Sequence, residues 1–176
     1  YGLSKLAQDQ LSLRAADEDG LDIVVARPFN HIGPVQEAGF AVSDFARQIA
    51  RIEQGLMPPI LKVGNLDAVR DIADVRDVVD AYVRLMDGGQ RGRAYNVCAG
   101  QPWRIRGLLE ALSRRSTASI DIEVDASRLR PLDTPVIVGD GSRIRAELGW
   151  RPSRPMEQTL EDTLNWWRAR VKANAS

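Results

Sequence analysis

The chain has 176 residues, of which 44% are hydrophobic and 27% charged, and its formal net charge at pH 7 is zero. This composition is that of an ordinary globular protein, and the lack of a net charge argues against nucleic acid and anionic membranes as partners. One cysteine and one histidine exclude a disulfide framework and predict no Cys/His metal site.

The chain starts with Tyr rather than Met, inside a segment with the pattern of a helix. We therefore expect it to be the back part of a longer protein. No apolar run is long enough to span a bilayer and no leader pattern is present, so the cytoplasm is the expected compartment.

The opening segment predicts a helix that runs to about Asp19 and stops at Gly20. It places Tyr1 and Lys5 four residues apart, on one helix face. A phenol is a weak acid–base catalyst at neutral pH, and a nearby cation makes its phenolate easier to form. Because the chain holds only three Lys and three Tyr, this spacing favours carbonyl reduction or alcohol oxidation over a chance pair on a surface helix.

Residues 21–28 form a short apolar run between turn signals, which predicts a buried parallel strand. The loop over residues 28–34 follows its carboxyl end, where open α/β sheets bind ligands. Asn30 and His31 in this loop are candidate site residues, although a lone histidine is more often structural.

Alternating helical and strand patterns continue to the end of the chain. A helix is expected to start at Ser43 or Asp44 and to close at Gly55. Strands are expected at 60–63, 94–97, 120–124 and 135–138, and further helices at 105–112, 142–148 and 155–171. Another helix, capped by Asp74 and ended at 88–89, should bury Val75, Val78, Val79, Tyr82 and Met86.

Three further motifs bear on the function. Gly139-Asp-Gly141 could open a dinucleotide fingerprint, but its third glycine position is Ile144, so a tight turn is expected instead. Arg70 and Arg130 on separate loops suit a diphosphate, with two ordinary surface arginines as the equal alternative. The tryptophans have no interleaved basic patch, which disfavours nucleic-acid binding.

Six segments together resemble the extended short-chain dehydrogenase/reductases, the NAD-dependent epimerase/dehydratase family that acts on nucleotide sugars. They are residues 1–5, 27–34, 64–71, 95–97, 130–131 and 148–150. Within the family, residues 30–34 and 64–67 are similar to the GDP-mannose branch, in which GDP-6-deoxy-4-keto-mannose reductases come nearest by pattern and GDP-mannose 4,6-dehydratases next. Val35 departs from the pattern, since relatives commonly carry Gly there, and we expect a locally different turn because a β-branched residue resists positive φ.

The resemblance implies an α/β fold: the C-terminal part of a Rossmann domain, a doubly wound parallel sheet, plus a smaller α/β substrate-binding domain. Residues 1–34 would end the Rossmann domain and residues 35–176 would form mainly the nucleotide-sugar domain, with 66–100 partly returning to the Rossmann sheet. The N-terminal nucleotide-binding half would be absent from this sequence. NADP or NAD is the implied cofactor, and a homodimer is implied for the complete protein.

The resemblance also implies residue roles. Tyr1 would donate a proton to the sugar 4-keto oxygen, and Lys5 would assist it and hold the nicotinamide ribose. The residues expected at the cofactor are Tyr1, Lys5, Pro28, Phe29 and His31. The residues expected at the substrate are Asn30, Val42, Arg47, Lys62, Arg70, Arg130 and Asp133, with Arg70 and Arg130 on the diphosphate.

The function expected from these roles is the NAD(P)H-dependent reduction of GDP-4-keto-6-deoxymannose to GDP-rhamnose, without a metal. The alternatives are a GDP-mannose 4,6-dehydratase or another nucleotide-sugar epimerase/dehydratase and, from a different class, a non-catalytic nucleotide-sugar-binding fragment. The residues that decide between them lie upstream of Tyr1 in relatives, so the chain alone is expected to be inactive.

Overall fold

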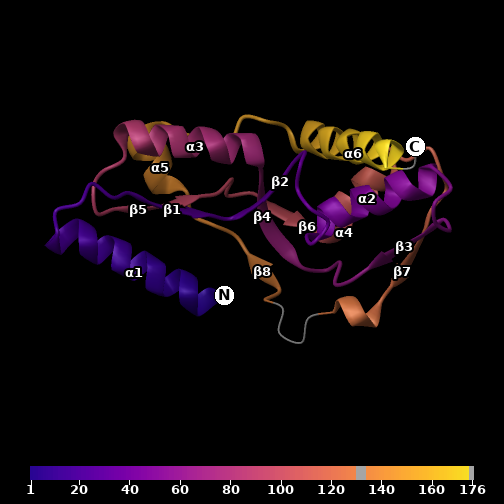
Figure 1. Ribbon diagram of the computed structural model, residues 1–176, viewed down its shortest axis with the longest axis horizontal. Helices are drawn as coiled ribbons and strands as arrows, with labels where there is room; N and C mark the ends of the chain where they lie inside the picture. The colour runs from indigo at the N-terminus through magenta and orange to yellow at the C-terminus, as the bar shows by residue number, and fades with distance from the viewer. Residues whose placement is uncertain (130–133, 175–176) are drawn as a thin grey trace.

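Helices gather around two hydrophobic cores at the two ends of an elongated molecule (Figure 1). The computed structural model describes residues 1–129 and 134–174. None of the helices in these residues is both long and apolar enough to cross a lipid bilayer.

Helix α1 (Gly2–Glu18) ends where the sequence predicts, with Asp19 as its C-cap and Gly20 at φ 69°. It lies along β1 (Val25–Pro28), and Arg27 Nε and Nη2 donate to the two carboxylate oxygens of Asp9 over 2.9 and 2.6 Å. Within α1, which is described throughout, Ala16 is the one buried residue.

Parallel pairing connects strands that lie far apart in the chain. Strand β1, which starts at Val25 and not at residue 21 as predicted, pairs with β5 (Ala94–Val97), and β3 (Ile60–Val63) pairs with β7 (Asp121–Val124). In the middle of the molecule, β4 (Val69–Asp74) pairs in parallel with β2 (Asn30–Ile32) and β8 (Val136–Ile137), and antiparallel with β6 (Pro102–Arg104). The loop predicted over 28–34 therefore contains a short strand.

The first core joins α3 (Val75–Gly88) and α5 (Ser142–Leu148) to β5. Asp74 caps α3 as predicted, because its side chain accepts from Arg76 N. The buried face was predicted only in part: Val78 is buried as expected, whereas Val79, Tyr82 and Met86 are exposed. Besides Val78, the helix buries Asp77, Ala81 and Leu85.

The second core packs α2 (Ala41–Glu53), α4 (Ile105–Ser113) and α6 (Met156–Ala173) against β3. Helix α2 starts two residues before the predicted cap, so Ser43 lies inside it and its Oγ accepts a 2.9 Å hydrogen bond from Trp167 Nε1. Gly55 follows α2 in the left-handed conformation, at φ 67°.

One buried carboxylate holds the central strand to two loops. The Oδ atoms of Asp71 on β4 accept from Ala99 N at 2.8 Å, Gly100 N at 2.8 Å and Gly139 N at 3.1 Å. A Cβ at Gly139 would lie 2.6 Å from Cys98 Sγ, so this close approach of backbone to side chain requires glycine. These three hydrogen bonds to Asp71 set the position of β4, which also borders the main cavity.

The turn after β2 keeps a backbone shape that glycine usually provides. Val35 has φ 73°, and it is the one non-glycine residue with positive φ in the described part of the chain. The sequence analysis predicts that a valine here resists positive φ and changes the turn. The prediction is wrong about the backbone: the β-branched Val35 adopts the positive φ that it was expected to resist.

Candidate active site

A cavity of about 630 Å³ opens between α2, β2, β4 and the short 3-10 helix η1 (Ala126–Arg128). Asn30 and His31 border it from β2, Val42 and Asp44 from α2, and Arg70 from β4. Arg128 borders it from η1. These segments are distant in sequence, and the pairing of β2 with β4 is what brings Asn30 and His31 close to Arg70.

Tyr1 and Lys5 lie on the same side of α1, as the spacing predicts. Lys5 Nζ is 5.8 Å from the centroid of the Tyr1 ring and donates to Gln8 Oε1 at 3.2 Å. Tyr1 is 95% exposed, and no group in the described residues hydrogen-bonds to its hydroxyl. The N-terminal end of α1 lies toward the middle of the molecule in Figure 1.

The strand β2 fixes the orientation of His31. Its Nδ1 lies 3.0 Å from Phe29 O, and its own backbone oxygen accepts from Gln36 Nε2 at 2.8 Å. A contact to a carbonyl requires Nδ1 to carry the hydrogen, which leaves Nε2 as an acceptor in the neutral ring. Pro28 ends β1, and Phe29 links it to Asn30, the first residue of β2.

Asp44 organises the α2 side of the cavity. It is 5% exposed, and Arg47 donates to its Oδ1 through Nε at 3.2 Å and Nη2 at 2.6 Å. Its Oδ2 accepts from Gln48 Nε2 at 2.7 Å and from Arg128 Nη1 at 2.5 Å. The carboxylate therefore holds two arginines in fixed positions.

Arg70 is held by the backbone of the central sheet. Its Nη1 donates to Val69 O at 2.8 Å and to Pro135 O at 3.4 Å. Because β8 pairs with β4 here, the guanidinium is anchored beside the cavity instead of extending freely into solvent.

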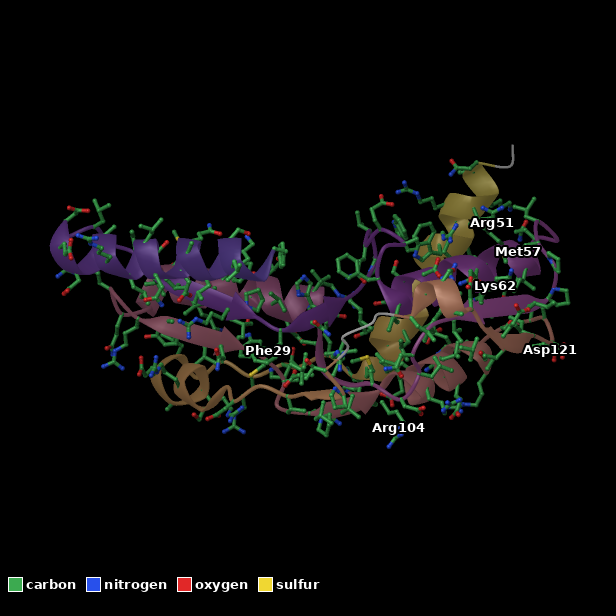
Figure 2. The ribbon with its side chains drawn as sticks, turned by 90° about the horizontal axis from the view of Figure 1, so that it is seen from below. Phe29, Arg51, Met57, Lys62, Arg104 and Asp121 are labelled. Carbon is green, nitrogen blue, oxygen red and sulfur yellow. The ribbon has the colours of Figure 1, made fainter. Side chains whose placement is uncertain are left out.

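Two of the predicted substrate residues that the structure describes, Arg47 and Lys62, do not line the cavity. Arg47 is turned to Asp44, and Lys62 lies on β3 with its side chain exposed (Figure 2). Arg130 and Asp133 lie outside the described residues.

Arg128, Asn65 and Thr134 line the cavity, and the sequence analysis did not name them. No signal local to Arg128 could show its contact with Asp44, which is 84 positions away.

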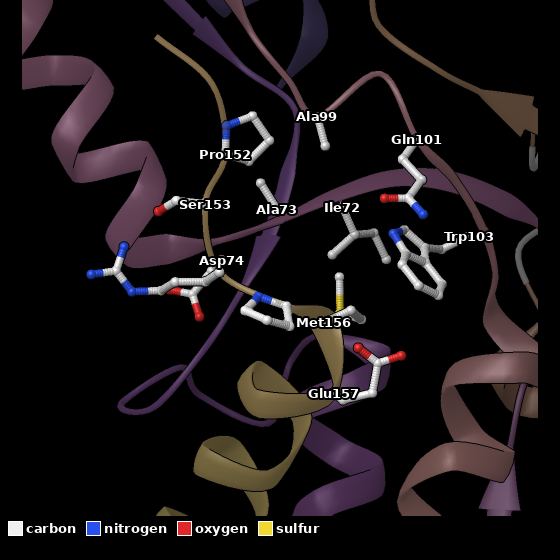
Figure 3. Close-up of a pocket in the computed structure, with 12 residues that line it drawn as sticks. Ile72, Ala73, Asp74, Ala99, Gln101, Trp103, Pro152, Ser153, Met156 and Glu157 are labelled. Atoms are coloured by element: carbon white, nitrogen blue, oxygen red, sulfur yellow. The ribbon is translucent and has the colours of Figure 1, made fainter.

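A smaller cavity of about 320 Å³ lies where β4 and β6 meet the start of α6. Figure 3 shows Gln101 and Trp103 on one side of it, with Pro152 and Ser153 on the other. Burial alone would raise the pKa of Asp74, which lines it, but hydrogen bonds from Arg76 and Thr159 outweigh burial and lower that pKa. This carboxylate is thus a paired structural group, and none of the described residues that line the cavity is a predicted site residue.

The single cysteine is unsuited to nucleophilic chemistry. Burial, reinforced by the charge of Asp71, raises the pKa of the Cys98 thiol to about 11. It stays protonated near neutral pH and behaves as a packing residue.

Comparisons with known proteins agree on one family. The family model described as GDP-mannose 4,6 dehydratase matches residues 1–163. GDP-6-deoxy-D-mannose reductase of Pseudomonas aeruginosa is 41% identical over 172 residues, which cover 98% of this chain and 57% of that protein. GDP-6-deoxy-D-talose 4-dehydrogenase of Aggregatibacter actinomycetemcomitans is 28% identical over 127 residues, covering 72% of this chain and 42% of that protein.

Solved structures give the same result. The NADPH complex of the protein called RMD from Pseudomonas aeruginosa superposes with a TM-score of 0.91 at 41% identity, over 97% of this chain and 57% of that one. A UDP-glucose 4-epimerase from Thermotoga maritima, solved with UDP-glucose, has a TM-score of 0.82 at 24% identity over 97% of this chain and 54% of that one, a likeness of fold alone. The fold is therefore that of the C-terminal part of a Rossmann-type short-chain dehydrogenase/reductase, and the chain spans between 42% and 57% of the length of these relatives.

Proposed function

Because the chain belongs to the family described by the GDP-mannose 4,6 dehydratase model, we propose that the protein containing it reduces GDP-4-keto-6-deoxymannose to GDP-rhamnose with NADPH or NADH. The main support is the cavity, which is bordered by two neutral polar residues and two arginines. These are Asn30, His31, Arg70 and Arg128. Phe29 directly precedes β2, the strand that carries Asn30 and His31. The size of the cavity and its mixture of neutral donors and guanidinium groups suit a sugar attached to a diphosphate. The 41% identity with a GDP-6-deoxy-D-mannose reductase supports the same substrate class.

The residues present fit a nicotinamide cofactor. The exposed Tyr1 hydroxyl and the Lys5 ammonium lie on one side of α1, and the carboxyl end of β1 presents Pro28 and Phe29, the edge at which α/β folds bind such groups. The cofactor supplies hydride when bound.

The residues of this chain supply the proton and the orientation of the substrate. In our proposal Tyr1 gives its phenolic proton to the 4-keto oxygen, and the positive charge of Lys5 stabilises the phenolate that remains. His31, with its Nδ1 tied to Phe29 O, presents Nε2 as an acceptor for a sugar hydroxyl. Arg70 and the predicted Arg130 and Asp133 would hold the nucleotide part.

Tyr1→Phe in the complete protein, expressed from its whole reading frame, tests the proposal. Removal of a general acid is expected to lower kcat by ~10²- to 10⁴-fold with little change in KM, measured as oxidation of NADPH in the presence of the 4-keto sugar nucleotide. Tyr82→Phe is the matched control, because this tyrosine lies on α3, away from the cavity, and should keep full activity. A Tyr1→Phe variant as active as the natural protein would refute the assignment.

A second candidate is the dehydratase, the activity after which the matching family model is named. A dehydratase converts GDP-mannose to the 4-keto sugar with no net consumption of added NADPH, whereas the reductase acts only on the keto sugar and consumes one reduced cofactor per turnover. Incubation with GDP-mannose alone therefore separates the two. The cytoplasmic location and the homodimer stay predictions.

A further inference from the structure

We infer that Arg128, held in place by the buried carboxylate of Asp44, binds the diphosphate of the nucleotide sugar and so is a further substrate-binding residue. The inference deepens the proposed function and rests on it. It adds a second arginine, from η1, to the one that β4 supplies.

The first step is the fixed position of the Arg128 guanidinium. Nη1 donates to Asp44 Oδ2 at 2.5 Å, and Nε lies 3.5 Å from Asp125 Oδ2. These contacts hold the side chain across the gap between η1 and α2. An arginine fixed in this way loses less conformational freedom when it binds a ligand.

The second step is the donor that remains. Nη2 of Arg128 takes part in neither ion pair and in no hydrogen bond to another described residue. The side chain is 37% exposed and borders the large cavity. A positioned N–H group that faces a cavity is suited to an oxygen acceptor of a ligand.

The third step is the charge around the cavity. Of the described residues that border it, Arg70 and Arg128 are cationic and Asp44 is the only acidic one. Both oxygens of Asp44 already accept hydrogen bonds from Arg47, Gln48 and Arg128. The Asp44 carboxylate therefore has no oxygen left unpaired to repel an anionic ligand. The net positive charge of the cavity lining favours an anion over a cation or a neutral sugar alone.

Asp44 is a positioning residue in this scheme. It is buried and does not need to touch the ligand, but it sets where Arg128 points. Removal of one partner of a buried ion pair leaves the charge of the other without compensation. The geometry of Arg128 therefore depends on Asp44. Their contribution to ligand affinity should therefore be coupled.

Calorimetric titration of the complete protein with GDP tests the inference. Arg128→Ala is expected to weaken GDP binding by ~10- to 100-fold, the usual effect of a charge-assisted hydrogen bond. Asp44→Asn should weaken it by a smaller factor, and the double variant should bind no more weakly than Arg128→Ala alone. The dependence of affinity on salt should also fall in Arg128→Ala, as it does when a contact between opposite charges is lost.

Arg104→Ala is the control, since this exposed arginine pairs with Asp67 at 3.6 Å and does not border the cavity (Figure 2). Unchanged GDP affinity in Arg128→Ala would overturn the inference, and so would losses of GDP affinity that simply add in the double variant. Turnover of the keto sugar by the natural protein would in either case leave the proposed function intact. Weaker binding with an unchanged salt dependence would indicate a contact to the base and would also overturn the inference. Thermal melting of each variant separates a loss of binding from a loss of folding.

Discussion

Asp71→Asn should destabilise the protein markedly, because this carboxylate accepts hydrogen bonds from three backbone N–H groups. The distances are 2.8 Å from Ala99 N and from Gly100 N, and 3.1 Å from Gly139 N, and the residue is 1% exposed. Asparagine has one acceptor oxygen, so its NH₂ group would face at least one of these donors. Hydrogen bonds to a charged acceptor contribute ~1.5–3 kcal/mol each, and a buried N–H left without a partner adds a further penalty. The expected loss is about 2–4 kcal/mol in the free energy of unfolding.

Urea unfolding followed by circular dichroism measures the loss, and hydrogen exchange at the amides of Gly100 and Gly139 shows where it arises. Asp80→Asn is the matched control: its carboxylate is 49% exposed and pairs with Arg84 on the helix surface. Such pairs contribute ~0–1 kcal/mol. If Asp71→Asn unfolds at the same urea concentration as the natural protein, or if the two amides exchange at unchanged rates, the hydrogen bonds to Asp71 do not hold the two loops in place.

Three other substitutions test separate parts of the fold. Val35→Gly should stabilise the protein by up to ~1 kcal/mol, because relief of the left-handed strain at φ 73° exceeds the entropy cost of glycine. Glu53→Gln should cost about 2 kcal/mol at neutral pH, since Arg168 donates to both carboxylate oxygens over 2.8 and 2.7 Å. The hydrogen bond from Arg168 lowers the pKa of Glu53, so this stabilisation is present above the unfolded pKa and is lost as pH falls through the folded pKa; the variant should show a flatter loss of stability in acid. Gly139→Ala should cost ~1–3 kcal/mol, because the new Cβ would lie 2.6 Å from Cys98 Sγ.

Each of these changes has a control or a refuting outcome. Glu37→Gly, in the same loop as Val35 but at a position without positive φ, should not stabilise. A Glu53→Gln variant with the acid profile of the natural protein would refute the role of its ion pair. Gly107→Ala places a Cβ in open space on α4 and should stabilise by ~0.5–1 kcal/mol through helix propensity, in contrast to Gly139→Ala. Thermal and urea unfolding measure all of them.

The sequence predicted the elements whose signals are local. Strand 60–63 matches β3 at both ends, and Asp74 caps α3, because a short apolar run and a capping residue act within a few positions. Strand β4 carries no such signal: it is the most connected strand of the described sheets, yet it contains Arg70, Asp71 and Asp74. The burial of Asp71 is compensated by N–H groups from loops 28 and 68 positions further along the chain.

The error on α3 has a related cause. The helix presents two apolar stripes, and periodicity alone does not say which of them meets the sheet. Val78 and Leu85 are buried, whereas Val79 and Met86, one position further along, are exposed. The parallel pairing of β1 with β5 fixes the surface on which α3 packs, and it thereby determines which apolar stripe of the helix is buried.

Asp44 shows how a small shift in an element changes the meaning of a residue. The sequence places it at the start of a helix, where an acidic side chain would cap backbone N–H groups. Helix α2 begins at Ala41, and Asp44 falls in its first turn, where its negative charge is still favourable with the helix dipole. Its carboxylate oxygens therefore do not cap the helix and accept hydrogen bonds from side chains instead. One of these side chains, Arg128, lies 84 positions away in the sequence. A residue that local rules identify as a helix start signal thus becomes the anchor of the cavity wall, because the boundary of the helix is set by packing of α2 on α4 and α6 and not by the cap.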